Sequence, residues 1–324
     1  MKAITYDTYG PPDVLKSVEL EKPTPADNEV LVKIQATSVT TGDYRARSLD
    51  MPAGFGLIGR LVFGVFGPRH KVLGTEFAGE IVAIGKAVKH FKIGDAVFAY
   101  PGAALGGYAQ YAVLAEDKAI ARKPANLTSQ EAVALSFGGA TALNFLRDKA
   151  GIKRGDKVLI NGASGGVGTA AVQLAKHFGA EVTGVCSTAN LDLVRSIGAD
   201  VLVDYTKEEF SRNGQSYDII LDTTGTLSYA GAEKSLKTNG RFLMVAGSLG
   251  QMLKMIFARK RDGKKGIAGY APELAEELRF LAHLAETGVY RPVIDRCYPM
   301  DKIVEAHAYV DTGRKRGNVV IAVD

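Results

Sequence analysis

Residues 157–168, KVLINGASGGVG, join a short apolar run to a cluster of glycines, and the helix-period pattern TAAVQLAK follows at once. This order predicts a strand, a tight turn and a helix. Gly162, Gly165 and Gly168 remove Cβ atoms where the chain must turn sharply and where a phosphate must approach the backbone. N–H groups in the first turn of the helix would point at that phosphate, and the helix dipole favours its charge. Because the spacing is Gly-x-x-Gly-x-x-Gly, the turn alone also fits a plain strand-to-helix connection.

Strands and helices alternate from this glycine-rich turn onward. The predicted strands are residues 157–161, 181–186, 201–204, 217–222 and 241–246. The predicted helices are residues 167–178, 189–197, 207–212 and 228–237. Because this order favours parallel pairing with right-handed crossovers, we predict an α/β fold with a doubly wound parallel sheet that binds a dinucleotide.

The first 125 residues have a different, β-rich pattern. Residues 29–36, 80–85 and 96–100 are apolar and rich in β-branched side chains, and Gly and Pro interrupt the chain often. Many short strands with turn signals predict a compact barrel-like domain. At residue 126 the pattern changes, because Thr128-x-x-Glu131 is a capping box that opens an Ala-rich helical segment.

The tail beyond Tyr270 predicts helices over residues 272–287 and 301–312 and strands near 293–297 and 318–323. Since chain ends often lie close together, we expect the last strand to rejoin the N-terminal domain.

An apolar segment, residues 51–72, stands apart within the β-rich part. It is too short and too often broken by Gly and Arg60 to span a bilayer. A mobile apolar flap over a ligand pocket is the favoured interpretation, since Gly gives mobility and Phe gives a lining. A segment that lies on a membrane surface is the alternative.

Length and composition set limits on the class of protein. A chain of 324 residues is long enough for about two domains. A net charge of +5 fits a scattered basic surface with a few residues for an anionic cofactor, and the basic run 259–265 lacks the aromatics of nucleic-acid binding. No apolar run reaches about 20 residues, so no transmembrane helix and no membrane partner are expected. Two cysteines make no disulfide framework, so we expect a reducing cytoplasm.

Several motifs along the chain resemble one family. The glycine-rich turn of residues 162–168, the segment 74–82 (GTEFAGEIV), the segment 91–97 (FKIGDAV) and the ending 314–321 (RKRGNVVI) are similar to the medium-chain dehydrogenase/reductase superfamily. The match is to its zinc-free quinone oxidoreductase (zeta-crystallin-like) branch. The resemblance implies a GroES-like β-barrel catalytic domain over residues 1–125, completed by about 290–324. It also implies a Rossmann domain over residues 126–289, an active site in the cleft, and a homodimer formed through the strand edge 241–246.

Metal ligands are missing where zinc-dependent members of this superfamily have them. The matching positions are Thr40, Thr75 and the neighbourhood of Ser136, none of which supplies a thiolate or imidazole. The five histidines are dispersed in the sequence. We therefore predict no metal.

The predicted cofactor is NADPH. An NAD-specific domain has a carboxylate at the end of the second strand, whereas Ser187 and Thr188 stand there and leave room for a 2′-phosphate. Both residues could instead only cap the next helix. Arg195, Arg314 or Arg316 would pair with the phosphate. The predicted cofactor contacts, several of them implied by the resemblance, are Thr141, Gly162, Ala163, Ser164, Gly165, Gly166, Val167, Gly168, Ser187, Thr188, Tyr205, Gly247 and Arg316.

The predicted reaction is hydride transfer to a quinone or an α,β-unsaturated carbonyl. Such acceptors need no metal Lewis acid, because hydroxyl donors can stabilise and protonate the phenolate or enolate. Thr40, Asp43 and Tyr44 are the candidate catalytic residues by their position in the first-loop motif. Asp43 could instead serve a turn or a buried ion pair with Arg45 or Arg47.

Two other functions remain open. One is an enoyl-thioester reductase with a basic entrance at residues 260–265. The other is a non-catalytic NADPH-binding scaffold or RNA-associated protein.

Overall fold

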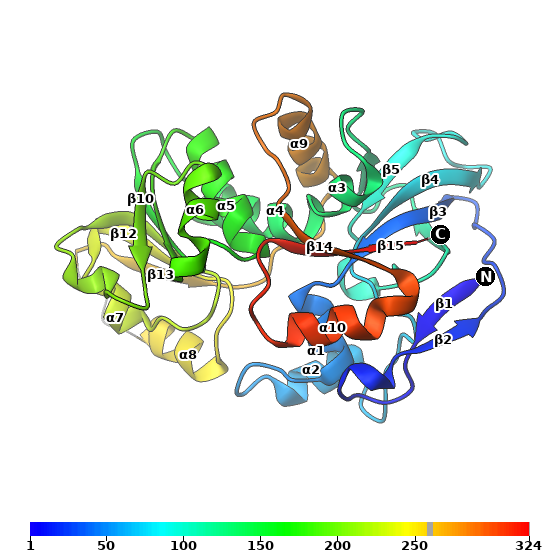
Figure 1. Ribbon diagram of the computed structural model, residues 1–324, viewed down its shortest axis with the longest axis horizontal. Coiled ribbons are helices and arrows are strands. Elements are labelled where there is room, and N and C mark those ends of the chain that lie inside the picture. The colour runs from blue at the N-terminus through cyan, green and yellow to red at the C-terminus, as the bar shows by residue number, and fades with distance from the viewer. Residues whose placement is uncertain (258–261, 324) are drawn as a thin grey trace. The chain divides into compact units, whose positions relative to one another are not determined.

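The structure is a computed structural model that describes residues 1–257 and 262–323 and divides into two compact units (Figure 1). The first unit comprises Met1–Met51, Gly56–Ala140 and Glu273–Asp324. The second comprises Pro52–Phe55 and Thr141–Pro272. The chain thus leaves the first unit for four residues directly before helix α2 and then returns to it.

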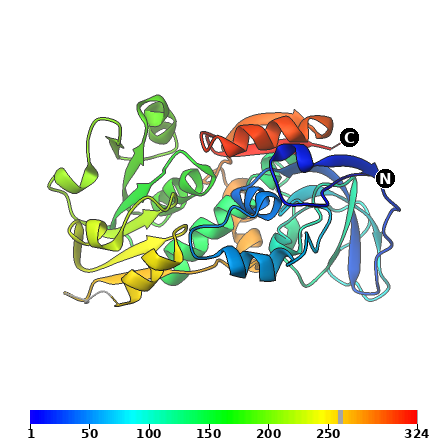
Figure 2. The same ribbon diagram turned by 90° about the horizontal axis from the view of Figure 1, so that it is seen from below.

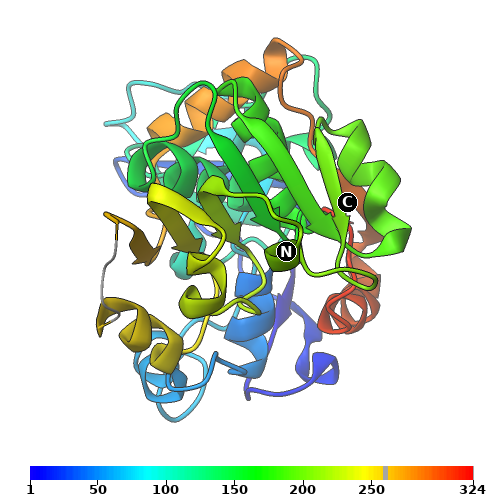
Figure 3. The same cartoon turned by 90° about the vertical axis from the view of Figure 1, so that its left-hand side faces the viewer.

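The second unit is built on a parallel sheet. Within the described residues its strand order is β10-β9-β8-β11-β12-β13, and every neighbouring pair is parallel (Figure 3). The strands are β8 (Lys157–Asn161), β9 (Glu181–Cys186), β10 (Val201–Asp204), β11 (Tyr217–Asp222), β12 (Leu236–Met244) and β13 (Lys265–Ala268). The helices between them are α5 (Gly166–His177), α6 (Leu191–Ser196), α7 (Tyr229–Glu233) and α8 (Leu249–Phe257). The order reverses beside β8, as in a doubly wound sheet, so the predicted α/β class is confirmed.

Two elements of this sheet differ from the prediction. β13 was missed, and it pairs with β12, so residues 241–246 are not the sheet edge, and that expectation is wrong. β12 also begins at Leu236, inside the predicted helix 228–237. Asn239 takes a positive φ of 61° there, and the register against β11 shifts. A strand with such an irregularity has no regular period that a sequence pattern can report. The predicted helix 207–212 is only a 3₁₀ turn, Phe210–Arg212.

The first unit holds a mainly antiparallel sheet. Its order within the described residues is β14-β15-β3-β4-β5-β7, with β6 also on β3, and β1 and β2 form a separate pair. The strands are β1 (Lys2–Thr5), β2 (Lys16–Glu19), β3 (Glu29–Ser38), β4 (Phe77–Ile84), β5 (Ala96–Ala99), β6 (Tyr111–Ala115), β7 (Ile120–Arg122), β14 (Ile294–Pro299) and β15 (Asn318–Ala322). β15 runs antiparallel to β3, with Val320 opposite Ser38. The prediction that the last strand rejoins the N-terminal part is therefore confirmed.

Six helices accompany these strands. They are α1 (Thr41–Ser48), α2 (Gly56–Phe63), α3 (Ser129–Val133), α4 (Ser136–Leu143), α9 (Ala275–Glu286) and α10 (Ile303–Asp311), and a π-helical turn (Asn144–Lys149) continues α4. Figure 2 turns the view and shows α2 in light blue. No helix in the described residues is long and apolar enough to cross a membrane.

The breaks between the units differ from the predicted domain bounds 125/126 and 289/290: the first lies later in the chain and the second lies earlier. The breaks lie at 140/141, within α4, and at 272/273. The side chain of Ser129 donates to Gln35 Oε1 at 2.6 Å, and Asn126 Nδ2 donates to the carbonyl of Ala285 at 3.0 Å. These bonds attach α3 and α9 to the first unit. The division into catalytic and cofactor domains stays a prediction.

An ion pair between a buried arginine and a partly exposed aspartate connects helix α1 to α10 in the first unit. The Arg47 side chain is 1% exposed and its Nη2 lies 2.7 Å from Asp311 Oδ2 on α10. Around it, Ile4, Leu73, Tyr108 and Ile321 belong to one apolar core. A charge removed from water at this depth requires its partner, so α1 is held rigidly against α10. The residues at the start of α1 are therefore well positioned.

Candidate functional site

The fold requires some, but not all, of the glycines in the turn between β8 and α5. Gly162 has φ +79°, and a Cβ at Gly168 would lie 2.0 Å from the Gly162 carbonyl oxygen, so the turn itself requires both residues. Gly165 is the N-cap of α5 without a side-chain cap, and a Cβ there would meet only the Gly162 oxygen at 3.6 Å. The fold therefore does not require glycine at 165. The open space before uncapped N–H groups fits the phosphate of a dinucleotide.

A second loop, after β11, contacts this turn. The Thr223 hydroxyl donates to the Asn161 carbonyl at 2.8 Å, and Asn161 Nδ2 lies 2.9 Å from Asp222 Oδ1 and from Thr224 Oγ1. Asp222 also accepts the backbone N–H of Thr224 and Leu227. The two loops lie at the carboxyl ends of adjacent strands, where sheets of this type bind ligands. Sequence reasoning missed this loop, although three threonines directly after a strand were a usable signal.

Asn190 brings two predicted cofactor residues together. Its Nδ2 donates to Ser164 Oγ at 3.1 Å and to Ser187 Oγ at 3.3 Å. The glycine-rich turn and the end of β9 are therefore joined by side-chain contacts. Ser187 starts a 3₁₀ turn, Thr188–Asn190, without a side-chain capping bond. The alternative in which these hydroxyls cap the next helix is wrong.

A carboxylate that sequence reasoning missed lies beside Thr188. Asp204, at the end of β10, accepts hydrogen bonds from the hydroxyls of Thr188 and Thr206. These bonds lower the pKa of Asp204 to about 2, so it is ionised at neutral pH. The Thr188 proton is thus committed to Asp204. The signal was available, because parallel pairing sets Asp204 opposite Cys186, next to the end of β9.

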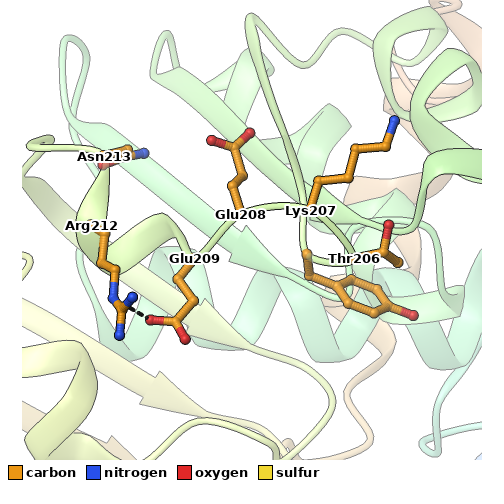
Figure 4. Close-up of a pocket in the computed structure, with 7 residues that line it drawn as sticks. Thr206, Lys207, Glu208, Glu209, Arg212 and Asn213 are labelled. Atoms are coloured by element: carbon orange, nitrogen blue, oxygen red, sulfur yellow. Dashed lines mark ion pairs between the residues drawn. The ribbon is translucent and has the colours of Figure 1, made fainter.

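Tyr205 is 63% exposed and lines an open hollow of about 470 Å³. Figure 4 shows the polar side chains of this hollow, where Arg212 Nε pairs with Glu209 Oε2 at 2.9 Å. Lys207 and Glu208 add one charge of each sign. The lining therefore has no net preference for an anion, and a phosphate contact of Tyr205 stays a prediction.

The surroundings of three other predicted cofactor residues are described by burial, packing and an ion pair. Thr141 is 6% exposed on α4. A Cβ at Gly247 would lie 2.3 Å from Met244 Sδ, so local packing already requires glycine there. Arg316 belongs to the first unit, where its Nε lies 3.6 Å from Asp295 Oδ1. The cofactor roles of all three stay predictions.

In the first unit, Thr40 and Thr75 meet although they are far apart in sequence. Their hydroxyl oxygens are 2.9 Å apart, and Thr40 Oγ1 donates to Asp43 Oδ2 at 2.6 Å. Thr40 is the N-cap of α1 and forms a capping box with Asp43. The hydroxyl pair thus lies at the start of the helix that the Arg47–Asp311 ion pair fixes.

Asp43 is fully buried and surrounded by donors. Its Oδ1 accepts the backbone N–H of Gly74 at 3.1 Å and of Thr75 at 2.9 Å, and its Oδ2 accepts that of Thr40 at 2.9 Å. Burial raises the pKa of Asp43, and these hydrogen bonds oppose the rise. Its partners include neither Arg45 nor Arg47, so the alternative of a buried ion pair with them is wrong. The catalytic role of Asp43 stays a prediction.

Glu76 is a second buried carboxyl that sequence reasoning missed. It is 0% exposed, accepts the backbone N–H of Phe137 at 2.6 Å and hydrogen-bonds the Ser38 hydroxyl. Burial raises its pKa to about 8. A charged residue between Thr75 and the apolar start of β4 was the signal, since acidic side chains are rarely buried without a specific partner.

The Tyr44 hydroxyl makes its hydrogen bond away from Thr40, Asp43 and Thr75. Its hydroxyl donates to Asp50, and this bond is the main reason that the pKa of Tyr44 is raised. A tyrosine held in this way is a weak proton donor at neutral pH. Its candidate catalytic role stays a prediction.

Among the described residues, no three His, Cys, Asp or Glu side chains come together as a metal site. Of the three positions that match zinc ligands in sequence, Thr40 and Thr75 form the hydroxyl pair. Hydroxyls bind Zn²⁺ poorly in comparison with thiolate and imidazole. The donor set of this site therefore does not fit zinc.

Known proteins match this chain over its whole length. Residues 26–125 match the family described as "Alcohol dehydrogenase GroES-like domain", and residues 197–321 match "Zinc-binding dehydrogenase". A chloroplast envelope quinone oxidoreductase homolog from Arabidopsis thaliana is 33% identical, over 99% of this chain and 98% of its own. An NADPH-dependent alkenal/one oxidoreductase, chloroplastic, of the same plant is 31% identical over 99% and 79%. The solved quinone oxidoreductase from Coxiella burnetii superposes with a TM-score of 0.87, at 29% identity, covering 100% of this chain and 99% of its own.

The names of these relatives correct one expectation. Both plant proteins are named for the chloroplast. They point to an organelle rather than to the cytoplasm, so the predicted cytoplasmic location is wrong. Few cysteines indicate only a reducing surrounding, which several compartments provide.

The glycine-rich turn on a doubly wound sheet, the antiparallel unit closed by the last strand, and these matches agree along the whole chain. The chain is a nicotinamide-dependent oxidoreductase that belongs to the medium-chain dehydrogenase/reductase superfamily, in its quinone oxidoreductase branch.

Proposed function

We propose that this protein is a zinc-independent, NADPH-dependent reductase of quinones and α,β-unsaturated carbonyls. The observation that carries the proposal is the hydroxyl pair Thr40–Thr75, at 2.9 Å, in the positions that match zinc ligands. In zinc-dependent alcohol oxidation the metal acts as the Lewis acid that stabilises the alkoxide. Electron-poor acceptors need only hydrogen-bond donors for the developing oxyanion.

NADPH is the proposed cofactor. The open N-terminus of α5 at Gly165 suits the pyrophosphate, and Ser187 with Asn190 offers donors to a 2′-phosphate. A relative named as NADPH-dependent supports the same choice. When bound, the reduced nicotinamide supplies a hydride to the acceptor.

The residues of the first unit would handle the proton. The Thr75 and Thr40 hydroxyls form a short chain to Asp43 Oδ2, and Thr75 Oγ1 also lies 3.1 Å from that oxygen. Asp43 orients both hydroxyls, because its own position is fixed by backbone N–H groups of Gly74 and Thr75. Because Thr40 already donates to Asp43 Oδ2, the Thr75 hydroxyl is the one that could turn its proton from Asp43 to a phenolate or enolate oxygen.

The test is a panel of acceptors with NADPH and NADH. We expect turnover with quinones and enones and no turnover with saturated ketones, and we expect a higher kcat/KM with NADPH than with NADH. Faster turnover with NADH would overturn the cofactor proposal. NADPH binding without turnover of any acceptor would favour a non-catalytic protein.

The enoyl-thioester alternative has no observation of its own. Of the basic residues expected at its entrance, 260 and 261 lie outside the described residues, and Lys264 Nζ donates to the carbonyl of Glu233 at 3.1 Å.

We also propose that two copies associate through β13. It is the outer strand of the parallel sheet in the described part of the chain, and an unpaired edge is a template for pairing with another strand. Light scattering after gel filtration should give a dimer mass, and Ile267→Pro in β13 should give a monomer. A monomeric wild-type protein would overturn the proposal.

A further inference from the structure

Helix α2 and the turn after it expose a dense group of large apolar side chains. We call residues 57–66 the α2 apolar surface. The exposed fractions are 73% for Leu57, 45% for Ile58, 57% for Leu61, 47% for Val62, 46% for Val65 and 105% for Phe66. Of the residues of α2, only Gly59 is buried. Soluble proteins usually scatter such side chains singly, and a contiguous group marks an interaction site.

The turn that presents these side chains is ordered by hydrogen bonds and packing. Tyr9 donates its hydroxyl to the Gly64 carbonyl at 2.8 Å, and the N–H of Arg69 donates to the Phe63 carbonyl at 2.7 Å. Gly64 has φ +132°, and a Cβ there would lie 2.0 Å from the Gly67 carbonyl oxygen. Phe63 packs on the apolar core of the first unit. These contacts hold the turn against the first unit with its apolar side chains exposed, and the mobile flap expected from its glycines stays a prediction.

The charge of this segment has one sign. Residues 51–75 contain no Asp or Glu, and Arg60, Arg69 and Lys71 are all exposed, although Lys71 Nζ pairs with Asp7 Oδ1 at 3.2 Å. Arg60 Nη1 donates to the Val65 carbonyl at 3.1 Å, and Arg69 Nη2 donates to the Leu61 carbonyl at 3.2 Å. Both guanidinium groups are thus held at the rim of the α2 apolar surface. An apolar face with a cationic rim is complementary to the headgroup region of an anionic bilayer.

We propose that the α2 apolar surface docks on an anionic lipid bilayer. Phe66, Leu57 and Leu61 would enter the boundary between headgroups and acyl chains, while Arg60 and Arg69 would contact lipid phosphates. A protein partner is less well suited, because residues 51–75 offer it no acidic side chain and therefore little side-chain specificity, whereas lipid phosphates require none. The proposal rests on the first unit alone and does not depend on the proposed function.

The test is cosedimentation of the full chain with vesicles of phosphatidylcholine, with and without phosphatidylglycerol. We expect binding only to the vesicles that contain phosphatidylglycerol, and weaker binding at high salt, because salt screens the charge attraction. Leu61→Ser/Phe66→Ser should lower the affinity by about tenfold or more, since two large apolar side chains no longer enter the lipid. Arg60→Gln should lower it by about fivefold.

Two control variants match this test. Ile93→Ser removes a single exposed apolar side chain, 61% exposed, from the turn before β5, and it should leave vesicle binding unchanged. Leu253→Ser/Phe257→Ser alters α8, whose side chains at these positions are 44% and 81% exposed, and it should also leave binding unchanged. Thermal unfolding of each variant shows whether it folds, and Arg60→Gln keeps the proposal testable if the double variant does not.

Four outcomes would overturn the proposal. They are no binding to either vesicle, equal binding of wild type and the α2 variants, loss of binding with the α8 variant alone, and binding that ignores phosphatidylglycerol. A change in oligomeric mass or in KM for acceptors, without a change in vesicle binding, would assign the surface to a second copy of the chain or to a substrate flap.

Discussion

The buried carboxyl of Glu76 links the stability of the first unit to pH. Its pKa is about 8 in the folded protein against an ordinary value of 4.5. Between these values the folded state holds a proton that the unfolded state has lost, so stability falls as pH rises. One such group contributes a slope of at most about 1.4 kcal/mol per pH unit. Urea unfolding of wild type and of Glu76→Gln at several pH values between about 5 and 8 measures this slope.

The free energies of unfolding of wild type and of Glu76→Gln should depend differently on pH. The glutamine in Glu76→Gln keeps a carbonyl oxygen that can accept the Phe137 N–H and an amide NH2 that can hydrogen-bond the Ser38 hydroxyl. It cannot ionise. The stability of wild type should therefore decrease relative to that of the variant as pH rises. Parallel stability curves across the window would contradict the pKa of Glu76.

Two substitutions at Thr75 distinguish a chemical role of its hydroxyl from a structural role of its side chain. Thr75→Val keeps the shape of the side chain and removes the contacts to Thr40 and Asp43, whereas Thr75→Ser keeps the hydroxyl. We expect the valine variant to lose about ten- to hundredfold in kcat with quinones, for lack of a positioned donor. We expect the serine variant to stay within about threefold of wild type on the same physical ground. Equal kcat for valine and wild type would remove Thr75 from the proposed mechanism.

At the scale of one element, the turn before α5 offers a matched pair of glycines. A Cβ at Gly168 would meet the Gly162 oxygen at 2.0 Å, whereas a Cβ at Gly165 meets it at an ordinary 3.6 Å. Gly168→Ala should therefore destabilise the fold, by about 2–4 kcal/mol. Gly165→Ala should cost the fold about 1 kcal/mol or less. It should nevertheless raise the Kd for NADPH by about tenfold, because the methyl group enters the phosphate site.

Thermal unfolding and fluorescence titration with NADPH measure the two effects separately. The account fails at this element if Gly165→Ala binds NADPH as wild type does. It also fails if Gly168→Ala is as stable as wild type.

At the scale of the whole molecule, regular patterns in the sequence predicted most of the fold. The predicted strands 157–161, 181–186, 201–204 and 217–222 have those bounds in the structure, because buried parallel strands are continuous apolar runs. The return of the last strand to the N-terminal part was also predicted, from its apolar run and from the closeness of chain ends, and the structure pairs β15 with β3.

Elements without a pattern were missed. β13 has only four residues, of which Gly266 is one, and it follows a basic run that hides it. β12 contains Asn239, which takes a positive φ of 61° within the strand. Both depend on pairing with a neighbouring strand, which no local sequence signal reports.

The candidate site was predicted only where its residues follow local sequence motifs. Thr40, Asp43 and the glycine-rich turn follow local motifs. Glu76 and Asp204 owe their environment to residues distant in sequence, Ser38 and Phe137 in one case and Thr188 in the other. Their importance appears only when the chain is folded.

The central claim is hydride transfer to an electron-poor acceptor without zinc. The most direct measurement is the rate of NADPH oxidation with a quinone, for protein treated with a chelator and assayed for bound zinc. The account predicts that zinc is far below one atom per chain and that the rate is unchanged by the chelator. A rate that disappears with chelation and returns with added zinc, or no turnover in either state, would contradict it.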